Sequence, residues 1–141
     1  MDKPAMIDRA FLEGMAEETA PFVGYYGFVV EEFGFGSTRV RLPYDVKHTR
    51  PGGTIGGPAM MALADFAMWV AVMSAVGEKP LAVTTNLAIN FLRKPSETDL
   101  IADVRLLKAG KRLCVGEIGI RGDGDADLCA HVTSTYSVPP S

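Results

Sequence analysis

Residues 53–77, GTIGGPAMMALADFAMWVAVMSAVG, decide the fold of this chain. A glycine-rich turn leads into about five turns of helix, and this helix is apolar on nearly every side, with Asp65 as its one charged residue. A helix that is hydrophobic all round belongs at the centre of a domain. Burial of an unpaired carboxylate there costs several kcal/mol. The pattern therefore predicts a central core helix in which Asp65 either faces a polar cleft or is buried at a cost in stability.

Both ends of this helix can be read from the sequence. Pro58 suits the first helical position, where its missing N–H costs nothing, so we expect a helix over about 58–76 with Gly57 at the N-cap. Gly77 is of the usual residue type just beyond a helix C-terminus. Free N–H groups at a helix N-terminus favour an anion or a developing oxyanion. Two interpretations stay open for Gly57, an oxyanion site or an ordinary Gly-Pro turn before a core helix.

Residues 59–76 also approach the length of a membrane span, since they comprise 18 residues with one charge. Asp65 falls well inside this stretch, no positively charged flank follows immediately, and the segments on both sides are strand-like. We therefore expect no membrane partner.

Length and composition point to one globular domain over residues 1–141. The charged fraction of 22% and the hydrophobic fraction of 48% are ordinary for such a domain. The net charge of −3 argues against a general nucleic-acid binder. The N-terminal residues MDKPAMIDRAF lack the apolar segment of a signal peptide, so we expect a cytoplasmic protein.

No metal site is expected. Cys114 and Cys129 do not have the spacing of metal ligands and lie in strand-like runs, which predicts reduced, buried thiols. Residues 122–127, GDGDAD, alternate acidic residues as a calcium loop does. The glutamate that an EF-hand needs at its twelfth position is missing, and no helices flank the segment. We expect a polar hairpin loop there.

A short leading helix is expected over about Arg9–Thr19, with Asp8 as its N-cap and Ala20-Pro21 at its end. The rest of the chain outside the central helix alternates strands and turns. One long helix among antiparallel strands predicts an α+β fold with a sheet wrapped around that helix. Six segments have the alternation or the β-branched and aromatic content of strands: Tyr25–Phe35, Ser37–Leu42, Leu81–Phe91, Asp99–Lys108, Leu113–Arg121 and Cys129–Val138.

The strand after the helix, LAVTTNLAINF at 81–91, alternates evenly, which places Thr84 and Asn86 on one face and Thr85 and Leu87 on the other. Small or apolar residues occupy both faces. Because the sheet's outer face has no helix to cover it, we expect this strand to be buried against a second copy of the chain.

The motif HTRPGGTIGGPAMMALAD at 48–65 is followed by a strand that ends in INFLRKP. Through these two segments the sequence resembles the hot-dog fold thioesterases, in particular the PaaI-like branch. The resemblance covers about residues 24–138 and implies a hot-dog fold, with Gly57 as the oxyanion N–H and Asp65 as the catalytic carboxylate. Two positions depart from the family pattern. Gly56 stands where many relatives have histidine, and Arg50 stands where several have asparagine or glutamine.

Helix geometry makes a second copy necessary for this chemistry. Gly57 and Asp65 are eight residues apart, or ~12 Å along one helix, whereas reacting atoms must approach within ~3–4 Å. Two antiparallel helices can pair the Gly57 of one with the Asp65 of the other, which is the arrangement that the resemblance implies. We expect at least a homodimer, and a dimer of dimers, that hydrolyses an acyl-CoA thioester without a cofactor. Asp65 acts there as the general base on water, or as the nucleophile.

Further site candidates each have a structural interpretation beside the functional one. Thr84 matches a position where relatives carry a hydroxyl that orients the water, and Asn86 is its neighbour, although threonine is common in strands. His48 lies in the motif loop, where it lines the site or supports the loop, and His131 is expected to pack in the last strand. The candidates for the coenzyme's phosphates, or otherwise solvated strand ends, are Arg93, Lys94, Lys111 and Arg112. The candidates for an acyl tunnel, or otherwise core, are Met60, Met61, Phe66, Met68, Trp69 and Met73.

Two other function classes share the fold. Dehydratases of 3-hydroxyacyl thioesters need a histidine paired with the acid, and the helix turn of this chain has none. A non-catalytic acyl-thioester binding protein stays open as the alternative, because Gly56 and Arg50 replace the usual motif side chains.

Overall fold

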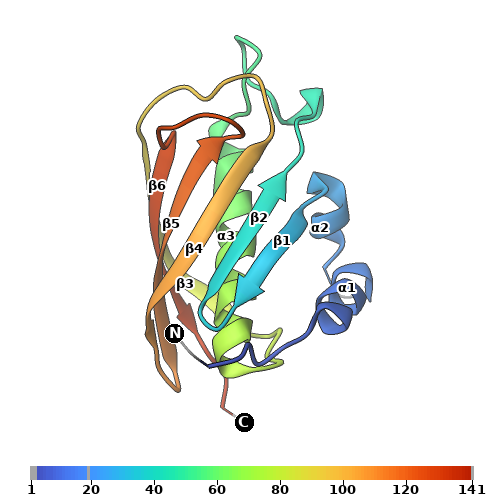
Figure 1. The fold of residues 1–141 in the computed structure, drawn as a ribbon, viewed down its shortest axis with the longest axis vertical. Coiled ribbons are helices and arrows are strands. Elements are labelled where there is room, and N and C mark those ends of the chain that lie inside the picture. The colour runs from blue at the N-terminus through green and yellow to red at the C-terminus, as the bar shows by residue number, and fades with distance from the viewer. Residues whose placement is uncertain (1–2, 19, 141) are drawn as a thin grey trace.

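A computed structural model describes residues 3–18 and 20–140 and has one sheet wrapped around one long helix (Figure 1). The helices are α1 (Arg9–Glu18), α2 (Pro21–Tyr26) and α3 (Gly57–Val76), with a 3-10 turn η1 (Val46–His48). The strands are β1 (Val29–Gly34), β2 (Ser37–Leu42), β3 (Val83–Phe91), β4 (Leu100–Ala109), β5 (Leu113–Gly122) and β6 (Ala130–Ser137). They form one antiparallel sheet in the order β1-β2-β4-β5-β6-β3. This confirms the predicted α+β hot-dog architecture.

Helix α3 forms the centre of the core, as its sequence predicts. Leu63, Met68 and Val70 have no exposed surface. The helix is long and apolar enough to cross a membrane by length and composition, but 67% of that window is buried inside the fold. Met61, Asp65 and Trp69, spaced four residues apart, remain wholly or partly exposed. One stripe of the core helix is therefore open to the surface.

The N-terminus of α3 differs from the prediction by one residue. Gly56, not Gly57, is the N-cap, with extended backbone angles (φ −84°, ψ 167°), and Gly57 is the first helical residue. Pro58 then lies at the second helical position, where the N–H of an ordinary residue would also lack an intrahelical acceptor. At the other end Gly77 adopts φ 99° and donates its N–H to the Met73 carbonyl at 2.9 Å, as expected of a residue after a helix.

The predicted strand at Tyr25–Phe35 is wrong in its first part. Residues 21–26 form α2, which Pro21 begins and Gly27 ends at φ 76°. The aromatic residues that suggested a strand form a cluster instead. The ring of Phe28 stacks on that of Phe66 of α3 at 4.9 Å and on that of Tyr26 at 5.1 Å. Packing against α3 therefore overrides the strand preference of these side chains.

The leading helix begins as predicted, because the Asp8 carboxylate accepts a hydrogen bond from the Phe11 N–H at 2.9 Å. The predicted last residue, Thr19, lies outside the described residues. Cys114 and Cys129 are free and buried, which confirms that prediction.

Strand β3 contains a bulge that the sequence did not indicate. Thr84 pairs with Tyr136 and Asn86 pairs with Thr135, so Thr85 is an extra residue on the β3 side. The extra residue separates the faces of Thr84 and Asn86, which were expected to share one. Thr84 contacts α3, whereas Asn86 lies opposite Thr135 on the outer face of the sheet.

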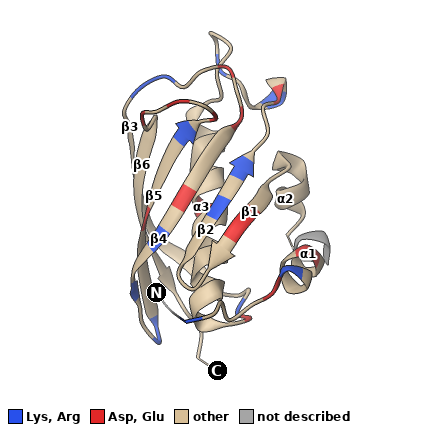
Figure 2. Ribbon diagram, in the orientation of Figure 1, with Lys and Arg blue, Asp and Glu red and all other residues tan. Residues whose placement is uncertain are grey.

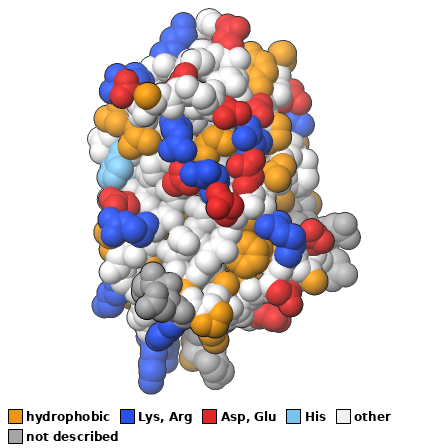
Figure 3. Space-filling model, in the orientation of Figure 1, with side chains coloured by type: hydrophobic (Ala, Val, Ile, Leu, Met, Phe, Trp, Pro, Cys, Tyr) orange, Lys and Arg blue, Asp and Glu red, His pale blue; other side chains and the backbone are white. Residues whose placement is uncertain are grey.

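The outer face of the sheet carries a network of opposite charges (Figures 2 and 3). Arg41 contacts Glu31 at 2.7 Å, Asp99 at 2.9 Å and Asp123 at 2.8 Å. Asp123 belongs to the GDGDAD loop, whose Asp125 accepts a hydrogen bond from the Ser96 hydroxyl at 2.8 Å. These acidic residues therefore hold the loop to the sheet. No group of three or more potential metal ligands occurs among the described residues.

Candidate active site

Two hydroxyl groups hold the carboxylate of Asp65. Thr84 of β3 donates from Oγ1 to Asp65 Oδ1 at 2.6 Å. The Tyr136 hydroxyl, from β6, contacts the same Oδ1 at 2.8 Å and the Asp65 backbone carbonyl at 3.0 Å. Thr84 and Tyr136 lie directly opposite each other in the β3–β6 ladder. Asp65 and Thr84 were both predicted site residues, and the structure brings them into contact.

Tyr136 was not identified from the sequence. It is 3% exposed, and burial, followed by the nearby charge of Asp65, raises the pKa of its hydroxyl well above the usual range. The phenol therefore stays protonated and can donate at any ordinary pH. A signal was present, because Tyr136 falls on the inward face of an alternating strand, and a buried tyrosine hydroxyl needs a partner.

A cavity of about 340 Å³ adjoins this carboxylate. Both hydroxyls contact Oδ1, and no group in residues 3–18 or 20–140 is seen to donate to Oδ2, so one carboxylate oxygen is left for a water or a ligand. The cavity has aromatic walls. Its remaining lining residues are Phe22, Phe66, Trp69, Pro80, Ala82 and Val83.

The N-terminus of α3 is a second feature of the site. As the first helical residue, Gly57 has an N–H with no intrahelical acceptor. Gly57 lines two cavities. One of about 330 Å³ is also lined by Phe91, Arg93 and Lys94, and the other, of about 370 Å³, is also lined by His48. A Cβ atom at Gly57 would lie 3.1 Å from the Phe91 ring. A glycine therefore lets this ring approach the start of the helix closely.

The loop before α3 is supported by His48. Its ring stacks on Tyr26 at 4.9 Å, and its backbone carbonyl accepts the Gly56 N–H at 2.9 Å. The side chain is buried and its Nε2 has no partner among the described residues. Burial, followed by the charge of Lys47, lowers the pKa of His48. These contacts favour the structural interpretation of His48, although it also lines a cavity beside Gly57.

The other predicted candidates separate into two groups. Arg50 is exposed and lines both cavities beside Gly57, and Arg93 and Lys94 line one of them. Lys111 and Arg112 are not brought to Gly57 within one chain. They line a cavity at the opposite end of α3, beside Val76. Asn86, on the outer face, does not join Asp65 and Thr84. Of the acyl-tunnel candidates, Phe66 and Trp69 line the Asp65 cavity, whereas Met68 and Met73 are fully buried core.

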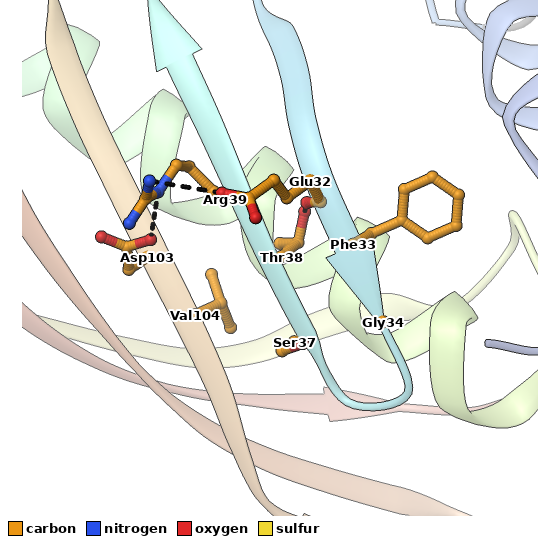
Figure 4. Close-up of a pocket in the computed structure, with 8 residues that line it drawn as sticks. All are labelled: Glu32, Phe33, Gly34, Ser37, Thr38, Arg39, Asp103 and Val104. Carbon is orange, nitrogen blue, oxygen red and sulfur yellow. Dashed lines mark hydrogen bonds and ion pairs between the residues drawn. The ribbon is translucent and has the colours of Figure 1, made fainter. Parts of the chain in front are cut away.

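A further hollow of about 350 Å³ lies on the outer face of the sheet (Figure 4). Its charged side chains already pair with one another, since Arg39 contacts Asp103 at 2.8 Å and Glu32 at 3.3 Å. Paired charges leave little to attract a ligand, and Asp65 and Gly57 lie elsewhere. The candidate site is therefore on the side of α3 and β3.

Known proteins resemble this chain in both sequence and fold. A family model described as the thioesterase superfamily matches residues 52–129. A protein named "Putative esterase" from Saccharolobus solfataricus is 32% identical over 114 residues, which cover 81% of this chain and 75% of that protein. The solved structure of a "putative thioesterase" from Silicibacter sp. TM1040 is 39% identical, with a TM-score of 0.86 over 96% of this chain and 94% of that one.

A solved mutant of the phenylacetic acid degradation protein PaaI from Thermus thermophilus is 22% identical, with a TM-score of 0.73 over 84% of this chain and 99% of that one, and so shares the fold. The family match covers Gly57 and Asp65 of α3 and Thr84 of β3. It supports acyl-thioester hydrolysis as the general class of reaction. The chain belongs to the thioesterase superfamily and has its hot-dog fold.

Proposed function

We propose that the protein hydrolyses acyl-CoA thioesters at a site that two copies of the chain share. The observation that carries this proposal is the Asp65 carboxylate, held through Oδ1 by Thr84 and Tyr136 beside a cavity of about 340 Å³. An oriented carboxylate beside open space is suited to accept a proton from water. The second carboxylate oxygen has no hydrogen-bond partner among the described residues and can therefore take a water.

The second copy is proposed from the position of Gly57. On one helix its N–H lies ~12 Å from Asp65 by the rise per residue, too far to serve one carbonyl carbon. Strand β3 supports pairing with a second copy, because it is an edge strand of the sheet and most of its residues are exposed. An uncovered edge of this kind invites strand pairing. The large apolar residues exposed on and beside it are Met61, Leu81, Val83, Phe91 and Leu92.

The proposed reaction needs water and no other co-reactant. Asp65 of one copy takes a proton from water as the oxygen attacks the thioester carbonyl carbon. The Gly57 N–H of the other copy and the positive end of its helix stabilise the negative charge that develops on the carbonyl oxygen. The carbon–sulfur bond then breaks, and a thiolate is a good leaving group because thiols ionise near pH 8.5. The proton on Asp65 passes to the thiolate, which leaves a carboxylic acid and coenzyme A.

The test is a panel of acyl-CoA substrates with a thiol reagent that detects released coenzyme A. We expect turnover by the wild type and a loss of at least about 10³-fold in kcat for Asp65→Asn, since the general base is removed. Asp127→Asn, in the exposed loop before β6, is the matched control and should keep full turnover. Binding of acyl-CoA without release by the wild type would contradict hydrolysis and identify the alternative, a non-catalytic acyl-thioester binding protein.

A further inference from the structure

A cationic cavity lies at the end of α3 opposite Gly57. It has a volume of about 500 Å³ and lies between the C-terminus of α3, the β4–β5 hairpin and the segment after β6. Lys79, Lys111 and Arg112 line it, and no carboxylate from the described part of the chain does. The C-terminal end of a helix carries a partial negative charge of about half a unit. Lys111 and Arg112 alone outweigh that partial charge, so this end of the cavity is positive and suits an anion.

Residues that are neighbours in the chain line this cavity and the Asp65 cavity. Lys79 lines the cationic cavity, and the next residue, Pro80, lines the Asp65 cavity. Tyr136 lines the Asp65 cavity and Val138 lines the cationic cavity. These two residues are two positions apart, and both are buried. From Asp65 to Val76 the helix advances 11 residues, or ~16 Å. A ligand that extends along α3 for this length would reach from the Asp65 cavity to the cationic cavity.

We infer that the cationic cavity binds the nucleotide phosphates of the coenzyme A thioester, and that the subunit supplying Asp65 also supplies these phosphate contacts. The inference rests on the proposed function. In coenzyme A about 13 bonds separate the sulfur from the nearest phosphorus, and an extended chain advances ~1.1–1.2 Å per bond, which gives ~15 Å. This length matches the ~16 Å between Asp65 and the end of the helix.

The cations near Gly57 fit this role less well. Arg93 and Lys94 line the same cavity as Gly57, which has only about 330 Å³. A phosphate bound there would lie beside the thioester carbonyl, and the ~15 Å arm would have to fold back on itself. Arg93 also donates from Nε to the Leu128 carbonyl at 2.9 Å. Of the four cationic candidates, the distances therefore select Lys111 and Arg112.

Two matched substrates test the inference. Butyryl-CoA carries the nucleotide, and S-butyryl-N-acetylcysteamine has the same reacting group without it. For the double variant Lys111→Ala/Arg112→Ala we expect KM for butyryl-CoA to rise about tenfold or more, since two charge-assisted phosphate contacts are lost. The kcat/KM for the short thioester should change less than about twofold. Lys108→Ala, on the same hairpin but outside the cavity, is the control and should leave both values unchanged. An unchanged KM for butyryl-CoA overturns the inference.

Binding of adenosine 3′,5′-bisphosphate, measured by calorimetry, tests the cavity without turnover. About tenfold weaker binding to the double variant supports the inference, and equal binding overturns it, even if the protein hydrolyses no thioester. Failure of the proposed function would instead show as a wild type that cleaves neither substrate. Equal thermal unfolding midpoints of the wild type and the double variant would show that folding is intact.

Mixed dimers test which subunit holds the phosphates. Asp65→Ala chains are mixed with Lys111→Ala/Arg112→Ala chains and allowed to exchange. If one subunit supplies both the acid and the phosphate contacts, every active site in the mixture has the raised KM. A component with the wild-type KM would mean that the two come from different subunits, which contradicts the assignment.

Discussion

Replacement of Tyr136 by phenylalanine isolates one contact of the candidate site. The change removes a single oxygen, and the ring keeps its place in the core, where the residue is 3% exposed. That oxygen contacts Asp65 Oδ1 at 2.8 Å and the Asp65 carbonyl at 3.0 Å. Because the substitution preserves volume, it creates no large cavity. Any effect on turnover therefore reports on the hydroxyl.

The size of the effect follows from the kind of bond that is lost. A hydrogen bond to a charged group contributes about 1.5–3 kcal/mol. Thr84 still donates to the same Oδ1 at 2.6 Å, so the carboxylate keeps one hydrogen bond. Phenylalanine also avoids the cost of burying a hydroxyl. We expect a loss of about 1–2 kcal/mol in the free energy of unfolding. We expect kcat to fall about 10–100-fold, which corresponds to about 1.4–2.8 kcal/mol in the activation barrier, with little change in KM.

Urea unfolding and steady-state release of coenzyme A measure the two effects separately. Tyr44→Phe is the control, since its hydroxyl also donates to a backbone carbonyl, that of Gly53 at 2.6 Å, but does not touch Asp65. Tyr44→Phe should lose comparable stability and keep its kcat within about twofold. If folded Tyr136→Phe turns over as fast as the wild type, the hydroxyl does not position the acid and the reasoning fails.

Three further variants probe the same site. Thr84→Val should lower kcat about tenfold while Thr84→Ser keeps most of it, because only the hydroxyl contacts Asp65; equal kinetics for the two variants would argue against this role. Gly57→Ala places a methyl 3.1 Å from the Phe91 ring, so its thermal midpoint should fall and adding Phe91→Leu should recover part of the loss. No recovery would show that the ring is not the obstacle. Burial lowers the pKa of His48 in the folded state. Below pH about 6.5 the unfolded chain therefore binds more protons than the folded chain. The free energy of unfolding then decreases as the pH falls from there through the lowered pKa. His48→Gln should remove that part of the pH dependence in urea midpoints at pH 7 and pH 5, and an unchanged slope would contradict it.

The sequence indicated the central helix and most strands because their patterns are long and regular. Strand β2 matches its predicted bounds. The bounds of the strands after α3 differ from the predicted ones by at most two residues at either end. Helix α2 was missed because Phe22, Val23, Tyr25 and Tyr26 are aromatic or β-branched, a composition typical of strands. Pro21 and Gly27 are ordinary helix boundary signals. The packing of Tyr26 and Phe28 against the core outweighs the local preference.

The site was predicted in part for a similar reason. Asp65 stands out as the one charge in an apolar helix, and the family resemblance indicated Gly57 and Thr84. Tyr136 looked like any strand tyrosine, because its role depends on which residue of β3 lies opposite. The pairing of β3 with β6 sets that contact, and an evenly alternating sequence around Thr85 gives no sign of the bulge.

The bulge links the register of β3 to the acid. Without the extra residue at Thr85, even alternation would turn Leu87 and Ile89 away from α3 whenever Thr84 faces it. With the bulge, Thr84 reaches Asp65 and both apolar residues still pack against the core. Burial of these apolar side chains therefore stabilises the one register in which Thr84 and Tyr136 lie side by side at the carboxylate. Because β3 is also the edge at which we propose the second copy to pair, ordering of that edge would hold the same register, and assembly and positioning of the acid would depend on the same strand.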